Sequence, residues 1–219
     1  MSGAISSKIL DTISYSDGSK SGSVRWLKRN WHRLLTHSAG IGPLLLFAVY
    51  TLSGSLVNPV RYAILHSGTI GLIFLVASLA CTPVRRIANW PGAIQIRRAL
   101  GLYGFLYVTL HFVVYLYWEN ELYWELIWRD LGERPAMPIG IAAFIVLIPL
   151  AATSTRGWQR RLGKRWRTLH RLVYLALPLS VWHYFWLDRD FKTWPWVFAI
   201  IVAVLLVLRL PVVRSVYKK

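Results

Sequence analysis

The residues of this sequence best suited to chemistry are its histidines. Five of the six lie within or at the ends of long apolar segments: His37, His66, His111, His170 and His183. An ionisable side chain is costly inside hydrocarbon and usually has a function there. Neutral imidazole is a ligand of haem iron, which offsets the cost of burying it. Because a single buried histidine is more often a hydrogen-bonded packing residue, the depths of these five decide between the two interpretations.

The segments that must position these histidines are long and apolar. Hydrophobic residues make up 55% of the 219 residues, charged residues only 16%, and the mean hydropathy is +0.43. A helix of about 20 apolar residues crosses roughly 30 Å of hydrocarbon, where the backbone finds no other hydrogen-bond partner. The sequence therefore predicts an all-α integral membrane protein, a bundle of six transmembrane helices near 34–53, 62–80, 100–118, 138–152, 169–187 and 196–210.

The distribution of basic residues orients the bundle. Of the 26 Lys and Arg residues, 21 lie in the N-terminal tail, in the loops around 81–98 and 153–171, and after residue 208. Positively charged loops resist translocation, so both termini are expected on the cytoplasmic side. The net charge of +17 then reflects topology and attraction to anionic membrane lipid, and no nucleic acid partner is needed.

Two regions differ in composition. Residues 1–30 form a basic, Ser- and Gly-containing tail that we expect to be disordered or partly helical in the cytoplasm. Residues 31–219 form the six-helix transmembrane domain, and no internal sequence repeat is apparent.

Two of the histidines share a depth. In this orientation the third and fifth segments both run outward, and His111 lies about 16 Å along the third at 1.5 Å per residue. His170 stands at the inner entrance of the fifth, and His183 lies about 20 Å further out. Two imidazoles at one level on different helices could bind a six-coordinate haem of the b type, since the chain has no CxxCH attachment motif.

An inner level is marked by His170 and by Arg97, which lies on nearly the same helix face as His111. In a straight helix, however, His170 and His183 would point in different directions, because thirteen residues turn it by about 220°. A kink at Pro178 would correct this phase difference.

Four stretches carry a family resemblance: CTPVRR (81–86), RRALGLYGFLYVTLHF (97–112), TSTRGWQRRLGKRWRTLHRLVYL (153–175) and VWHYFWL (181–187). In order and spacing they resemble the MsrQ family, the haem-binding membrane subunits of bacterial periplasmic methionine sulfoxide reductase systems. That family is part of the ferric reductase-like transmembrane group. The resemblance runs from about Trp31 to the C-terminus.

The resemblance implies one or two haem b groups. His111 and His183 would ligate the outer haem, and His170 an inner one. Arg97 stands where related oxidases have a fourth histidine, and His37 is the alternative second ligand. FMN is a further cofactor associated with the family.

The resemblance also implies partners and a location. The chain would lie in the bacterial inner membrane and take electrons from the quinone pool or a cytosolic flavin reductase. It would pass them to a periplasmic, molybdopterin-dependent methionine sulfoxide reductase subunit. The sequence has no GxGxxG motif or P-loop, so it predicts an electron conduit without its own nucleotide-binding domain.

Several residues and functions keep two interpretations. Arg97 and Arg98 either enforce topology or pair with haem propionates or a flavin phosphate. His66 either packs or donates to a quinone or a propionate. The alternatives to an electron-transfer subunit are a self-sufficient transmembrane ferric or quinone reductase and a non-redox membrane scaffold or transporter.

Overall fold

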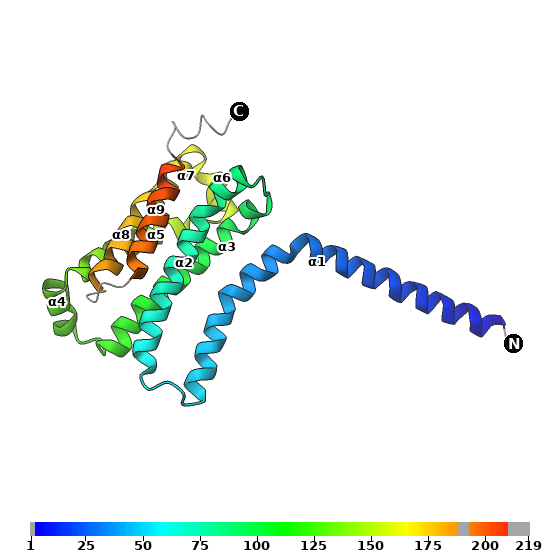
Figure 1. The fold of residues 1–219 in the computed structure, drawn as a ribbon, viewed down its shortest axis with the longest axis horizontal. Coiled ribbons are helices and arrows are strands. Elements are labelled where there is room, and N and C mark those ends of the chain that lie inside the picture. The colour runs from blue at the N-terminus through cyan, green and yellow to red at the C-terminus, as the bar shows by residue number, and fades with distance from the viewer. Residues whose placement is uncertain (1–2, 188–192, 210–219) are drawn as a thin grey trace.

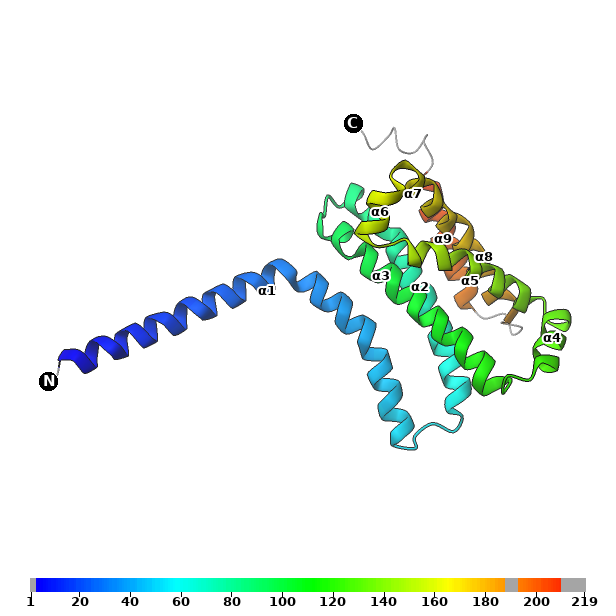
Figure 2. The ribbon, with the colours of Figure 1, turned by 180° about the vertical axis from the view of Figure 1, so that it is seen from behind.

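The structure, a computed structural model, describes residues 3–187 and 193–209, and every regular element in these two ranges is helical (Figures 1 and 2). The α-helices and two short helical segments, a π-helix η1 and a 3-10 helix η2, are α1 Gly3–Leu52, α2 Pro59–Ile87, α3 Gly92–Val114, η1 Tyr115–Glu119, α4 Trp124–Glu133, α5 Ala136–Ala152, α6 Arg156–Leu162, α7 Lys164–Leu169, η2 His170–Leu172, α8 Val173–Leu187 and α9 Thr193–Val207.

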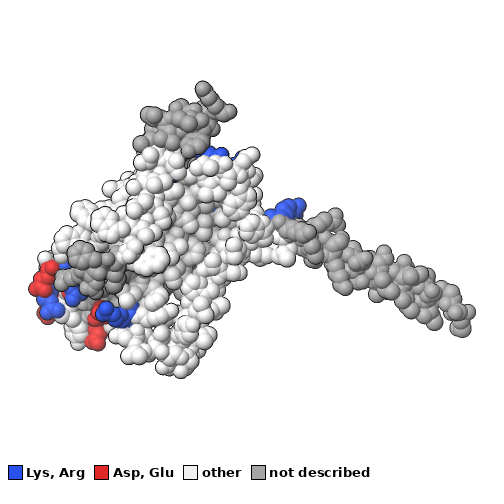
Figure 3. Space-filling model, viewed as in Figure 1, with Lys and Arg blue, Asp and Glu red and all other residues white. Residues whose placement is uncertain are grey.

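Three helices are long and apolar enough to cross a membrane: Arg29–Leu52 within α1, the whole of α2, and Gly92–Glu119, which joins α3 to η1. A fourth span would combine α4 with α5, but the chain bends by 104° between them. The molecule is thus an all-helical, multi-pass membrane protein. On the face seen in Figure 3 the middle of the bundle carries no charge, and acidic side chains gather only around α4.

The bundle is assembled from two closely packed helix pairs. α2 packs along α3, and α5 packs along α8, while α1 lies against α3 and α9 against α8 and α2. α2 and α3 approach closely because glycines lie in their interface. A Cβ at Gly71 would lie 2.8 Å from Val108, and one at Gly104 would lie 2.8 Å from Leu75. Small residues permit such approach where helices associate by van der Waals contact.

The N-terminal tail, expected to be disordered or partly helical, is joined to the first membrane helix. The structure continues α1 back to Gly3. Once a helix is nucleated, each further residue adds a hydrogen bond at little cost, which lets α1 extend into polar sequence. Figure 1 shows this part of α1 running away from the bundle.

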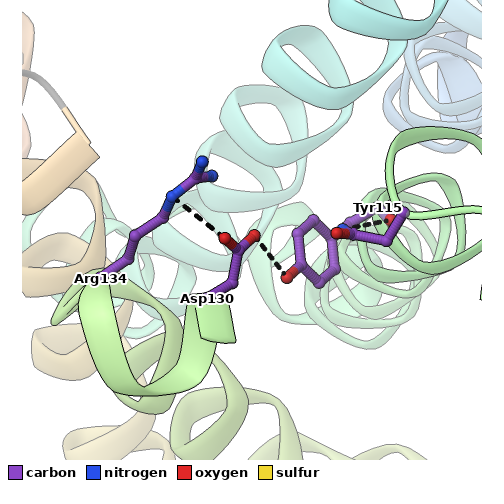
Figure 4. Close-up of polar contacts among 4 residues, drawn as sticks. Tyr115, Asp130 and Arg134 are labelled. Carbon is purple, nitrogen blue, oxygen red and sulfur yellow. Dashed lines mark hydrogen bonds and ion pairs between the residues drawn. The ribbon is translucent and has the colours of Figure 1, made fainter. Parts of the chain in front are cut away.

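A polar network holds α4 against the end of α3. The Tyr115 hydroxyl donates to Oδ2 of the buried Asp130 over 3.1 Å, and Arg134 pairs with Oδ1 at 3.3 Å (Figure 4). The side-chain amide of Asn120 donates to the Tyr115 carbonyl over 3.1 Å. These bonds fix one end of the bundle, where α4 presents Trp124 and Trp128 with 76% and 72% of their surface exposed.

A buried arginine supplies a hydrogen-bond donor that is missing from α2. Pro83 lies inside this helix and has no N–H to donate to the carbonyl one turn back, which belongs to Leu79. Arg209 supplies the missing donor: its Nη2 bonds that carbonyl, and its Nη1 donates to the Tyr174 hydroxyl over 2.8 Å. The end of α9 is thereby attached to α2 and α8.

We expect Arg209→Ala to destabilise the protein by about 2 kcal/mol, because it leaves a buried carbonyl without a donor. Pro83→Ala restores the N–H, so the loss should be smaller in that background. Unfolding in mild detergent, measured for both single variants and the double variant, checks this. An equal loss with and without Pro83 would show that the carbonyl is not what Arg209 stabilises.

Candidate cofactor site between the helix pairs

His111 of α3 and His183 of α8 meet at the seam between the two helix pairs. Their ring centroids are 6.1 Å apart and the ring planes are nearly perpendicular, at 84°. Both side chains are largely enclosed by the bundle. The structure therefore brings together two histidines that are far apart in sequence and carried by different helices.

One nitrogen of each ring is committed to a backbone carbonyl. His111 Nδ1 lies 2.9 Å from the oxygen of Ile64 in α2, and His183 Nδ1 lies 2.7 Å from that of Ala136 in α5. A carbonyl can only accept, so both Nδ1 atoms must carry the proton. In the neutral rings the lone pair is then on Nε2, which is the nitrogen free to bind a metal.

Each ring also lies against a glycine. A Cβ at Gly68 would stand 3.0 Å from His111 Nδ1, and one at Gly140 only 2.6 Å from His183 Nδ1. In both cases the glycine follows the accepting carbonyl by one helical turn. The missing side chain leaves room for the imidazole to reach the second lone pair of that carbonyl.

The two halves of the site are built alike, although no repeat was apparent in the sequence. Each histidine lies 47 residues after the residue whose carbonyl it bonds. The carbonyls and glycines were not among the predicted site residues. A glycine within a helix of large apolar residues was the available signal, since such a glycine usually has a packing or functional reason.

The donor set limits what this site can hold. Among the residues that the structure describes, no three His, Cys, Asp or Glu side chains gather into a metal site. A bare zinc site needs three or four protein ligands, whereas a porphyrin supplies four and leaves two axial positions. An imidazole nitrogen binds a metal at about 2 Å and lies about 1 Å from its ring centre, so two axial rings have centres roughly 6 Å apart. The ring-centre distance of 6.1 Å is compatible with the two imidazoles sharing one porphyrin.

His170 is arranged differently. Its Nε2 lies 3.1 Å from the hydroxyl of Thr153, and that hydroxyl donates its own proton to the Pro149 carbonyl over 2.6 Å. The hydroxyl must accept from His170, so Nε2 carries the proton here. The ring also stacks on Trp166 at 4.0 Å. In this arrangement Nε2 of His170 is not free to bind a metal.

A change of helix type that the sequence did not predict lies between His170 and His183. His170 begins η2, a 3-10 turn, and α8 starts only at Val173. A 3-10 turn has three residues per turn, so it alters the rotation between His170 and His183. Pro178 lies inside α8, which continues through it.

The other predicted site residues are dispersed. Arg97 is close enough to His170 for its charge to act on that ring. Arg98 and His37 instead line a hollow between α1 and α3, where His37 Nδ1 lies 2.9 Å from the Tyr103 hydroxyl. His66 stacks on Tyr62 and bonds the Tyr62 carbonyl of its own helix. Among the described residues, neither His37 nor His66 forms a hydrogen bond or a ring contact with His170.

Known proteins resemble this chain. Residues 64–181 match the family described as "Ferric reductase like transmembrane component". Relatives from Herminiimonas arsenicoxydans, Rhodospirillum rubrum and Deinococcus radiodurans are each called protein-methionine-sulfoxide reductase heme-binding subunit MsrQ. Each is 42% identical to the chain, covering 78%, 83% and 78% of it and 80%, 89% and 85% of the relative. No solved structure matches.

The glycine behind His183 gives a test that needs no cofactor. We expect Gly140→Ala to push the imidazole off the Ala136 carbonyl, because the new methyl would lie too close to Nδ1. The ¹⁵N ring shifts of His183 in haem-free protein should then move away from the Nδ1-protonated form. Gly132→Ala, where a Cβ meets nothing within 4 Å, is the control. Unchanged shifts in Gly140→Ala would contradict this role.

Proposed function

The chain belongs to the ferric reductase-like transmembrane family and, within it, to the MsrQ heme-binding subunits. We propose that it carries electrons through a b-type haem to a periplasmic methionine sulfoxide reductase. The observation that carries this proposal is the pair of imidazoles from α3 and α8, 6.1 Å apart, each fixed through Nδ1. The name of these relatives, heme-binding subunits, supports haem as the group that the pair would hold.

His111 and His183 would hold this haem, each through the Nε2 atom that its Nδ1 hydrogen bond leaves free. Bound haem iron supplies one-electron chemistry by alternating between its ferric and ferrous states. The chain's own contribution is to orient the ligands: the carbonyls of Ile64 and Ala136 hold the rings and make Nε2 more electron-rich. Rings held in this way are already oriented before a cofactor binds.

A second haem at His170 fits the described geometry less well. Nε2 of His170 donates to Thr153, so ligation through that atom requires the bond to break. Arg97 would then stand beside it as a partner for a propionate, since a guanidinium can bind a carboxylate through two parallel bonds. We therefore propose one haem at His111 and His183. A second haem would bind at His170 only if the hydrogen bond between Nε2 and the Thr153 hydroxyl is broken.

The topology is proposed to be six spans with both termini in the cytoplasm of a bacterium, the membrane being the inner one. Every described carboxylate side chain lies between Glu119 and Glu133, at the α4 end, while the arginines of α6 and α7 lie at the other end. This asymmetry supports the α4 end as periplasmic.

The electron donor and acceptor follow from this orientation. We propose that quinol or a cytosolic flavin reductase delivers electrons at the cytoplasmic side. If the flavin reductase is the donor, FMN would carry the electrons to this chain. A molybdopterin-dependent reductase would accept them near α4, close to the level of His111 and His183.

Substitution of the paired histidines tests the haem. We expect His111→Ala and His183→Ala to lose the same b-type haem, so that both lack its Soret and split alpha bands and bind about one haem less than the parent protein. Absorption spectra and iron quantitation of purified protein measure this.

His66→Ala is the matched control, because His66 is also a membrane histidine but bonds only its own helix. It should keep the parent spectrum. Different residual spectra for His111→Ala and His183→Ala would mean that the two do not share one iron. A haem-free parent protein would support a scaffold or transporter.

Reconstitution separates a conduit from a self-sufficient reductase. In proteoliposomes with a reduced quinone, we expect oxidation of the haem only when the periplasmic reductase and methionine sulfoxide are both present, since the described chain holds no substrate-reducing group of its own. Rapid reduction of ferric chelates or quinones without the partner would favour the self-sufficient reductase.

A further inference from the structure

A cleft between α1, α3 and α6 has no part in the haem proposal. It consists of two adjoining hollows of about 450 and 360 Å³ that share His37, Gln95, Arg98 and Ala99. We call it the α1–α3 cleft. It opens at the inner end of the bundle, and its two hollows differ in character.

One hollow is basic. Arg33, Arg98 and Arg156 come from three different helices and all line it. Arg33 is held in place because its Nη2 donates to the side-chain oxygen of Gln95 over 3.1 Å. Arg98 and Arg156 form no ion pair within the described residues, where the one salt bridge joins Arg134 to Asp130 at the opposite end.

The other hollow is mainly apolar. Ala99, Leu102 and Leu106 form its wall along α3, with Tyr103 at its side. From Arg98 to Leu106 the helix advances about 12 Å, which is close to the roughly 15 Å of one leaflet's hydrocarbon. In the orientation proposed above, on which this inference rests, the basic hollow lies at the cytoplasmic headgroup level and the apolar wall runs from there toward the membrane centre.

We propose that the α1–α3 cleft binds an anionic phospholipid of the inner leaflet, with its phosphate on Arg33, Arg98 and Arg156 and an acyl chain along Leu102 and Leu106. A quinone would fit the apolar wall but carries no charge for three arginines. A soluble phosphate ester would satisfy the arginines but leave the apolar wall unused. Basic pockets between membrane helices on the cytoplasmic side are known to hold such headgroups.

Topology alone would also place arginines at this level. It would not make three of them converge, from α1, α3 and α6, on one hollow that continues into an apolar wall. The lipid would join α1 to α3, whose direct packing is slight compared with the α2–α3 pair.

The test uses the full chain in nanodiscs of phosphatidylcholine with and without phosphatidylglycerol, followed by native mass spectrometry of retained lipid. We expect preferential retention of phosphatidylglycerol, reduced roughly 30-fold in the double variant Arg98→Gln/Arg156→Gln, because each arginine contributes about fivefold. Arg86→Gln/Arg167→Gln removes two exposed inner-face arginines outside the cleft and should retain the lipid.

Leu106→Trp keeps the charge and narrows the apolar wall, so it should also lower retention. Equal retention in the parent protein and Arg98→Gln/Arg156→Gln would overturn the proposal. Displacement of the lipid by inorganic phosphate or FMN would assign the site to a soluble phosphate instead. Ubiquinone binding that ignores the arginines and excludes phosphatidylglycerol would assign it to a quinone. None of these outcomes depends on haem content.

Discussion

Hydrocarbon offers no hydrogen-bond partner, so a polar atom inside this bundle is costly unless the chain itself supplies a partner. Three membrane-embedded hydroxyls meet this constraint locally: Thr69, Thr109 and Ser180 each donate to the carbonyl one turn back on their own helix. Tyr107, almost completely buried, instead crosses to α1 and donates to the Gly40 carbonyl over 2.8 Å. Arg209 meets the same demand at the carbonyl left free by Pro83.

The candidate haem site follows from the same constraint. A buried imidazole has two nitrogens to satisfy, and only Nδ1 of His111 and of His183 finds a carbonyl. The second nitrogen of each ring needs a metal or a water. His170 differs in which nitrogen is partnered: its Nε2 has a hydroxyl acceptor, so Nδ1 is the nitrogen without the proton. The outer pair is distinguished from the inner histidine because two neighbouring rings both keep Nε2 free.

The sequence predicted the helical, multi-pass character of the chain, because hydropathy over a window of helix length depends on local composition alone. Where six spans were predicted, the described residues show three single helices long enough to cross a membrane and a fourth only as the bent α4–α5 pair. It also predicted that His111 and His183 share a depth, since rise per residue is fixed. It could not reveal Gly68, Gly140 or the two carbonyls as partners, because these contacts depend on the rotation of one helix against another. The bend between α4 and α5 and the 3-10 turn at His170 were missed for a related reason: each is decided by tertiary packing and not by periodicity.

The arginines show how one residue type can serve two purposes without conflict. Insertion keeps Arg33, Arg98 and Arg156 on the cytoplasmic side, and this already places them at the level of lipid phosphates. Bringing them together in one cleft then requires only that α1, α3 and α6 be rotated so that their basic positions face each other. A count of charges cannot distinguish these roles, since orientation depends on how many arginines a loop carries. Binding depends on where they point, which only the packed structure determines.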